Sequence, residues 1–569
     1  MYLYISQRRY KDRLHRYAQI CISERVDGKP VRRVLGSLGR LDRLTPAAID
    51  GLIASLGRLA SPGTGLGLAD AEMLAARRYG PIRVARQLWE ELGLPDLIAT
   101  GGQSFPVEEA LFRLVANRLV DPRSKLATVD WQETVTWPRP GALTYPQLLR
   151  AMDVLQAQKK PVEEALFGRV RELFSVPLHI VWYDLTSSYF EGDGVCELAA
   201  YGHSRDHRPD RSQVVLGLAL TQEGFPVAHD LFAGDTADVR TVKDMATQLR
   251  DRFGFADAVV VGDRGLLSAE NAAALDELGL RYVLALRTRQ HAGVPRVVAA
   301  AVARGLARPR DVDAPWSVQE VAPIEAVRHV VVYSAFRAAH DRVVRIHRLK
   351  ATRDALARLE QRVADGKLSG SRAVTARATR ILSQSKVSRF YRWELVQGRF
   401  TFRLDRPVYR SQRQLDGIYV LVSNAPDLAT DEIVAAYRQL IAVEDAFRVL
   451  KSLVKLRPIY HWTRRRVEVH VFICVLAYLV ATVLEQKLAR AGVPMTAARA
   501  LDALASVQAV EHRWGEATVT QMTRPSPEAV PILRALGLSD LPRILRIEPA
   551  HAPAPDTAHR SATAPATTP

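Results

Sequence analysis

An alternation of strand-like and helix-like segments between residues 179 and 287 restricts the fold of this 569-residue chain more than any other feature. Three apolar segments come first, HIVWYDLTSS, QVVLGLALT and PVAHDLFAG, and each predicts a strand. A helix with Thr236 as its cap, the strand DAVVVGD, a second helix between Ser268 and Gly279, and the strand RYVLALR follow. This series predicts an α/β fold in which helices cover a mixed sheet.

Two aspartates stand at or near the ends of these predicted strands. Asp184 follows four apolar residues, and Asp263 ends its strand between Gly262 and Gly265. A carboxylate that is buried without a partner is costly, and a divalent metal ion would be such a partner. The two glycines let backbone and metal approach closely. For either aspartate alone, the alternative is a strand-end residue that caps the next turn.

A third carboxylate comes later in the chain. The order of the first seven elements is that of the ribonuclease-H fold, but the pattern becomes irregular from about residue 288 to 414. GIYVLVSN then predicts another strand, and DEIVAAYRQLIAVEDAFRVLKS predicts one long helix. On that helix Tyr437, Glu444 and Lys451 are seven residues apart, so we expect them on one face, with Arg448 one turn after Glu444. A solvated Glu–Arg pair is the alternative.

Three carboxylates suit a site for two divalent ions. Such ions lie about 3.5–4 Å apart, activate an attacking oxygen and stabilise a leaving one. Magnesium prefers oxygen ligands, which carboxylates supply. We therefore predict that Asp184, Asp263 and Glu444 bind two Mg²⁺ ions, for which Mn²⁺ could substitute.

The charge balance indicates a polyanionic partner. The formal net charge is +18, and residues 341–413 contain 19 Lys and Arg against six Asp and Glu. The first 43 residues contain eleven against four. Such an excess is most often a nucleic-acid footprint, although a general bias towards arginine would produce it too. The side chains that we expect to contact DNA are Arg372, Arg377 and Arg380, and as a weaker patch Arg464, Arg465 and Arg466.

Cysteine spacing and hydropathy exclude other classes. Cys21, Cys196 and Cys474 are far apart, so neither a disulfide scaffold nor a zinc site is expected. The apolar stretch from Val469 to Leu484 is shorter than the ~20 residues that span a bilayer, so we interpret it as a buried helix. The first residues hold no apolar core of signal-peptide length. A cytoplasmic protein without a membrane partner is the expectation.

Four pieces of the sequence resemble a known family. YDLTSSYFEG, VVVGDRGLLSAEN, DGIYVLVSN and YRQLIAVEDAFRVLKS are similar to segments of the DDE transposases of bacterial insertion sequences, in the group with a Tyr-Arg-Glu-Lys signature. The general layout agrees from about Met1 to Leu488. The resemblance implies a ribonuclease-H-like core interrupted by a β-rich insertion. It also implies a homodimer that binds double-stranded DNA at the terminal inverted repeats and joins the element ends to target DNA.

The resemblance also assigns residues. It implies that Asp184, Asp263 and Glu444 form the catalytic triad, and that Tyr437 and Lys451 are the signature Tyr and Lys. The signature Arg should fall three residues after the Tyr, where this chain has Leu440. Arg438 and Arg448 are nearby substitutes, and on one continuous helix Arg448 is the better placed.

The chain is long enough for several domains. The expected boundaries are 1–60 for a small basic β-rich region, 69–175 for a helical DNA-binding domain, 176–287 and 416–490 for the two parts of the core, 288–415 for the basic insertion, 491–548 for a C-terminal helical region and 549–569 for a disordered tail.

Two other functions stay open on the sequence alone. A ribonuclease-H-fold nuclease or resolvase would cut DNA without joining it, and it would use the same carboxylates. A non-catalytic, domesticated DNA-binding relative would need none of them. The basic insertion and the Tyr and Lys positions favour the transposase, because strand transfer requires extra contacts to the DNA end.

Overall fold

A computed structural model of the chain divides into two compact units. Unit 1 comprises Met1–Val84, Trp131–Pro138 and Arg499–Pro569, and unit 2 comprises Ala85–Asp130 and Arg139–Ala498. Of the expected disordered tail, 549–569, all residues after Pro549 lie outside the described part of the chain. The structure describes residues 2–10, 13–26, 29–41, 44–45, 49, 71–98, 104–177, 179–192, 196–266, 268–324, 327–514 and 517–549.

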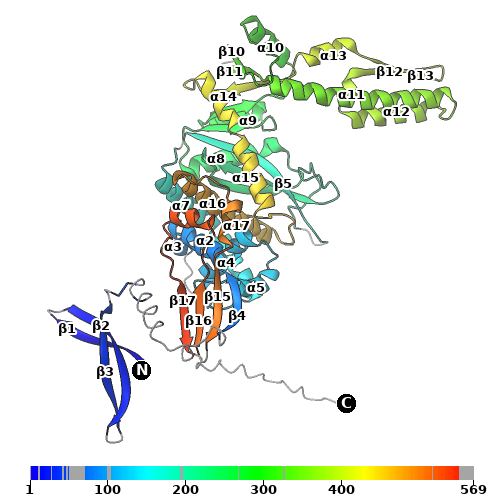
Figure 1. Cartoon of the computed structure of the whole chain (residues 1–569). Helices are drawn as coiled ribbons and strands as arrows, with labels where there is room; N and C mark the ends of the chain where they lie inside the picture. Colours follow the sequence, from blue (N-terminus) through cyan, green and yellow to red (C-terminus); the bar gives the residue numbers. More distant parts are fainter. Residues whose placement is uncertain are drawn as a thin grey trace, which may run out of the picture. The chain divides into compact units, whose positions relative to one another are not determined.

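Unit 1 contains two antiparallel sheets. The first has the order β1-β2-β3, with β1 at Tyr2–Tyr10, β2 at Arg13–Val26 and β3 at Lys29–Arg40, and it confirms the small N-terminal sheet (Figure 1). The second has the order β17-β16-β15-β4. Its strands are β4 (Ala71–Arg78), β15 (Gln508–Trp514), β16 (Ala517–Met522) and β17 (Ile544–Pro549).

The second sheet corrects two expectations. Residues 71–78 form a strand, although the helical stretch was expected to begin at Ala69, and residues 491–548 contain three strands besides α17 (Ala497–Leu504) and α18 (Ala529–Ala535). The sequence AEMLAARR has no strand-like alternation. It is extended because it pairs with β15, more than 400 residues away, where Arg77 forms a 2.7 Å ion pair with Glu511.

The helices before the core are confirmed from residue 80 onwards. α4 is buried along almost its whole length and packs against α6 and against α16, the long apolar helix. Its buried Glu108 accepts hydrogen bonds from Arg86 and from the Trp89 indole, both at 2.7 Å, because a buried carboxylate requires partners. The helices are α2 (Gly80–Glu91), α3 (Leu94–Leu97), α4 (Val107–Val120), α5 (Ala127–Trp131), α6 (Tyr145–Ala157) and α7 (Lys159–Phe174).

The main sheet of unit 2 has eight strands in the order β10-β11-β14-β9-β8-β5-β6-β7. β8 pairs in parallel with β5 and with β9, and the other pairs are antiparallel. The order β7-β6-β5-β8-β9 is the strand order of the ribonuclease-H fold, so the predicted fold class is confirmed. The strands are β5 (Ile180–Tyr189), β6 (Gln213–Leu220), β7 (Pro226–Ala233), β8 (Val259–Gly262), β9 (Arg281–Ala285), β10 (Ser317–Ile324), β11 (Val327–Tyr333) and β14 (Ile418–Ser423).

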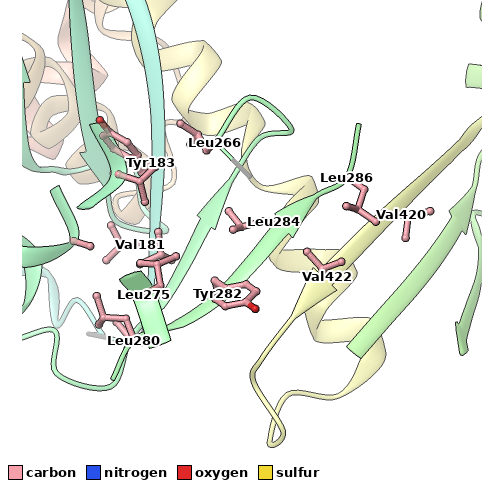
Figure 2. Close-up of a cluster of buried hydrophobic side chains, with 14 of the residues drawn as sticks. Val181, Tyr183, Leu266, Leu275, Leu280, Tyr282, Leu284, Leu286, Val420 and Val422 are labelled. Carbon is pink, nitrogen blue, oxygen red and sulfur yellow. The ribbon is translucent and has the colours of Figure 1, made fainter. Parts of the chain in front are cut away.

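One hydrophobic cluster joins the two parts of the core. Figure 2 shows Tyr282 and Leu284 of the first part near Val422 of the second, with Val181 further along the same cluster. The cluster extends to α9 (Ala269–Glu277) and to α8 (Val242–Phe253). β14 therefore lies between β9 of the first part and β11, and the apolar contacts hold the two parts together.

The predicted ends are correct for α9, but the predicted cap of α8 is wrong. The Ser268 hydroxyl accepts a hydrogen bond from the Asn271 amide at 3.0 Å, and Gly279 has φ +70°, so both ends of α9 are confirmed. α8 begins at Val242, after a 3₁₀ turn over Asp238–Thr241, so Thr236 is not its cap.

The insertion is mainly helical, and the expectation of a β-rich segment is wrong. α11 has 30 residues and α12 has 15, whereas β12 and β13 have six each. Leu349, Leu356, Leu359 and Val363 recur at helical spacing and pack in a cluster of their own. β10 and β11, from the same expected range, extend the main sheet. The remaining elements are α10 (Val294–Ala303), α11 (Ala335–Ala364), α12 (Ser371–Ser385), β12 (Tyr391–Val396), β13 (Arg399–Leu404) and α13 (Arg406–Arg413).

The predicted long helix after β14 is two helices, α14 (Thr430–Arg438) and α15 (Ile441–Ser452). At the junction the amides of Leu440, Ala442 and Val443 bond to carbonyls three residues back, which interrupts the α-helical ladder. α16 (Arg464–Arg490) follows. By length and composition α16 could cross a membrane. However, 94% of its most apolar 18-residue stretch is buried within the protein, as expected for a core helix.

Gly417 is a point at which the sheet should be sensitive to a single methyl group. It has φ +72°, and an added Cβ would lie 2.5 Å from the Ser334 carbonyl oxygen. We expect Gly417→Ala to lower the free energy of unfolding by about 2–4 kcal/mol, measured by urea titration. Gly366→Ala, at φ +69° with open space around it, should cost only about 1–2 kcal/mol. Equal losses would show that the close approach at Gly417 is unimportant.

Candidate active site

The pairing of two parallel strands brings Asp184 and Asp263 side by side. The β5–β8 ladder ends with Tyr183 opposite Gly262, and each aspartate is the residue directly after this pair. Neighbouring strands lie about 4.8 Å apart, so the two backbones leave the ladder as immediate neighbours. Asp263 is thus at a strand end as predicted, whereas Asp184 lies in the middle of β5.

Local hydrogen bonds hold both aspartates. Oδ1 of Asp184 accepts from the Leu185 amide at 2.7 Å, and Oδ1 of Asp263 accepts from the Gly265 amide at 2.6 Å. Gly262 contributes through packing, because an added Cβ would lie 2.8 Å from Leu266 Cδ1. The turn that carries Asp263 is therefore fixed by the hydrogen bond from Gly265 and by the close packing of Gly262 against Leu266.

α14 and α15 bring Glu444 to the same region. α15 packs against β5, and the Trp182 indole donates a 2.8 Å hydrogen bond to the Ala436 carbonyl of α14. Burial raises the pKa of the Tyr437 phenol, and the negative charges of Asp263 and Glu444 raise it further. Tyr437 therefore lies within electrostatic range of a carboxylate from each part of the core.

The carboxylates share a region but do not form a closed metal site. Within the described ranges, no group of three or more His, Cys, Asp or Glu side chains is arranged to hold a metal ion. Asp184 and Asp263 are half-buried, whereas Glu444 is exposed. The chemistry of the three donors fits a hard divalent cation, and the two aspartates have the backbone proximity that shared ligation requires.

A cavity of about 660 Å³ opens beside Glu444. Aromatic and cationic side chains line it together with that carboxylate. The guanidinium of Arg438 lies 4.4 Å from the centre of the Trp316 ring, and the Tyr419 and Tyr437 rings are 5.5 Å apart. Arg337 also faces the cavity. The sequence analysis missed Arg337 and Trp316, because they are more than 100 residues from Glu444 and carry no recognisable spacing.

The signature positions do not share one helix face. Tyr437 lies in the last turn of α14, whereas Glu444 and Lys451 lie on α15, so the expectation that all three share one helix is wrong. Nζ of Lys451 forms a 2.8 Å ion pair with Asp206, whose side chain is only 2% exposed. Burial lowers the pKa of the Lys451 ammonium, and Asp206 opposes that effect. Arg457 contacts the same Asp206 oxygen.

Arg448 points to a different partner. It forms a 2.6 Å ion pair with Asp445 and its side chain is 72% exposed. Arg438, not Arg448, lines the cavity beside Glu444. The expectation that Arg448 is the better placed of the two relied on a continuous helix, which the junction at Leu440 breaks.

The two predicted basic patches differ in their environments. On α12, Val374, Ala378 and Leu382 are buried, and the opposite face is exposed. Arg372, Arg377 and Arg380 lie on that exposed face. At the start of α16, by contrast, each arginine has an acidic partner, which reduces its availability to DNA. The pairs are Arg464 with Glu468 and Glu197, and Arg465 and Arg466 with Asp153.

Comparison with protein families gives two matches. The model described as "Transposase DDE domain" matches residues 179–480, more than half of the chain, and that described as "IS1634 family transposase, N-terminal domain" matches residues 3–64. Comparison with curated proteins gives no match.

Two solved structures show weak likeness. The piggyBac transposase in a synaptic complex with hairpin DNA is 10% identical, with 76% of this chain and 82% of that chain covered and a TM-score of 0.36. The Mos1 transposase in a paired-end complex with the left transposon end is 15% identical, with 32% and 60% covered and a TM-score of 0.14. At such scores neither likeness supports a detailed correspondence.

The Asp206 ion pairs should stabilise the region that holds Lys451. Asp206→Asn removes the buried charge shared by Lys451 and Arg457, so we expect the free energy of unfolding to fall by about 1–3 kcal/mol in chemical denaturation. The control is Asp210→Asn in the same loop, because Asp210 pairs with Arg208 at the surface, where solvent screens the charges, and should leave the free energy of unfolding almost unchanged. Equal effects of the two changes would contradict a structural role for Asp206.

Proposed function

The chain belongs to the DDE-domain transposases of bacterial insertion sequences, and we propose that Asp184, Asp263 and Glu444 are its catalytic carboxylates. The observation that supports this proposal most is the end of the β5–β8 ladder, where two aspartates follow one pair of residues. The packing of α15 against β5 adds the glutamate.

The enzyme depends on divalent metal, and we propose two Mg²⁺ ions as its complement. When bound, such ions would activate the attacking oxygen and stabilise the leaving oxygen of a phosphodiester. Asp184 and Asp263 would hold them from the sheet. Glu444 is exposed on the first turns of α15, so its side chain is free to turn towards the two aspartates.

The cavity beside Glu444 has the chemistry to hold the DNA strand that is cut. Arg337 and Arg438 supply guanidinium groups for phosphate oxygens, and Tyr437 supplies a hydroxyl donor. We propose that Arg438 takes the part of the signature arginine that Leu440 leaves open. Lys451, held by Asp206, adds a positive charge on α15 beyond Glu444, and Arg448 is a more distant contact.

The proposed substrate is double-stranded DNA at the element's terminal inverted repeats. We propose that a homodimer binds two ends, cuts them and joins the 3′ ends to target DNA in the cytoplasm, where it associates with the nucleoid. The exposed arginines of α12 support a role for the insertion in holding DNA, as does the charge of residues 341–413. The ion-paired arginines at the start of α16 contribute less.

Loss of a carboxylate should separate cutting from binding. Asp184→Asn, Asp263→Asn and Glu444→Gln should each abolish cleavage of a radiolabelled inverted-repeat duplex in Mg²⁺, because each removes a proposed metal ligand. Binding of the same duplex should remain close to that of the wild type. Asp244→Asn, an exposed position on α8, is the control and should cut normally. Full cleavage by any of the three variants would refute its assignment, and cutting without joining would favour a nuclease.

The exposed face of α12 should contribute to DNA affinity without sequence preference. Reversing the charge of Arg372, Arg377 and Arg380 to Glu should weaken binding to any duplex and lower the slope of log affinity against log salt by up to about 3, since each phosphate contact contributes about 0.9. The Gln variants of the same positions control for repulsion. An unchanged slope would mean that this face is only solvated.

A further inference from the structure

A second cavity, of about 530 Å³, is lined by positive charge. It lies within unit 2, between the end of α4, the segment that follows it, the turn after α15 and α16. Its cationic side chains are Arg118, Arg123, Lys125, Lys455 and Arg457. Two histidines, His461 and His470, face it as well, and none of the described residues that line it is acidic.

Several polar atoms of this cavity are buried without a hydrogen-bond partner. Among the described residues, these include Nζ of Lys125, Nε of Arg118 and Nδ1 of His470. The side chains of Lys125 and Arg118 are each 5% exposed. Buried cations are almost always paired, because an unpaired one loses its hydration without compensation. Such a group can still form hydrogen bonds with a ligand that carries oxygen atoms.

Among the described residues, no carboxylate forms an ion pair with Lys125 or Arg118. The acidic residues nearby, Asp121 and Asp206, pair with Arg123 and Arg457. Cys474 is the nearest candidate for an anion, but burial raises the pKa of its thiol and keeps it neutral, although Arg118 and Lys125 oppose this. Burial, and then Arg118, lower the pKa of Lys125 well below its usual value. Arg118 is held in place by the carbonyls of Lys455 at 3.2 Å and Arg123 at 2.5 Å. The guanidinium is thus oriented, but its charge is not neutralised.

We propose that this cavity binds a phosphate group. An ammonium and a guanidinium, both buried, match the several oxygens of a phosphate. Tyr145 and Tyr460 line the cavity and are 37% and 58% exposed, so a base or sugar attached to the phosphate would have aromatic surface to contact. The phosphate comes either from a DNA backbone or from a small molecule. The DNA source rests on the proposed function, whereas the chemistry of the cavity does not.

The cavity is connected to the proposed active site. Arg457 lines it and also contacts Asp206, which pairs with Lys451 on the helix of Glu444. A phosphate bound there would compete with Asp206 for Arg457. Asp206 would then form a stronger ion pair with Lys451. DNA held in this cavity would therefore be linked to the helix that carries the third carboxylate.

The test uses the full chain and inorganic phosphate. At constant ionic strength, phosphate should raise the melting temperature of the wild type relative to chloride, because it binds the folded state. Lys125→Met should raise the apparent Kd for phosphate about tenfold or more. Without phosphate this variant should melt above the wild type, since it removes a buried amine that has no hydrogen-bond partner. Lys243→Met, exposed on α8, should behave as the wild type does.

A second measurement distinguishes the sources. If a DNA phosphate occupies the cavity, Lys125→Met should lower the slope of log affinity for duplex DNA against log salt by about 0.9, and inorganic phosphate should compete with DNA. A lost phosphate response with an unchanged slope would assign the cavity to a small phosphorylated ligand. A phosphate response that persists in Lys125→Met would overturn the proposal.

Two further variants keep the result interpretable. If Lys125→Met does not fold, Lys455→Gln, an exposed position at the cavity, should weaken the phosphate response. Asp184→Asn should keep the full response although we expect it not to cut DNA. The phosphate proposal and the catalytic proposal can therefore fail independently.

Discussion

The parallel pairing of β5 with β8 is the interaction on which the proposed site depends. It ends at Tyr183 and Gly262, and only this register places the two following aspartates beside one another. The same strand carries Trp182, whose indole bonds to α14 and so fixes where the second part of the core meets the first. If the register of β5 against β8 shifted by one residue, Tyr183 would point out of the hydrophobic core. The same shift would move the two aspartates apart.

Patterns in short stretches of sequence predicted those helices and strands whose form depends on residues nearby in the chain. The strands from β5 to β9 and the ends of α9 follow from alternation and capping residues, which neighbours along the chain determine. β4 could not be predicted in this way, because its extended form depends on β15. The insertion was missed for another reason: the resemblance suggested strands, whereas the spacing of Leu356, Leu359 and Val363 favours a helix.

The candidate site shows the same division. Asp184, Asp263 and Glu444 were identified from strand ends, order and resemblance, and the backbone brings their elements together. The roles of Tyr437 and Lys451 were derived from one continuous helix, and the break at Leu440 separates them. Their environments come from remote residues: Lys451 pairs with a residue 245 positions away. No spacing within a helix could reveal such a partner.

The basic side chains that produce the excess of positive charge lie in three different environments. Some arginines serve the fold, as Arg86 does beside Glu108, and their charge is neutralised internally. Others, such as Arg377 on α12, are exposed and available to any polyanion. Lys125 and Arg118 belong to neither group, since they are buried and none of the described residues that line their cavity is acidic. The first group pairs with buried carboxylates, the second is in contact with solvent, and the third is buried and has polar atoms without a hydrogen-bond partner. That environment, which net charge alone could not have shown, is the basis of the proposed phosphate site.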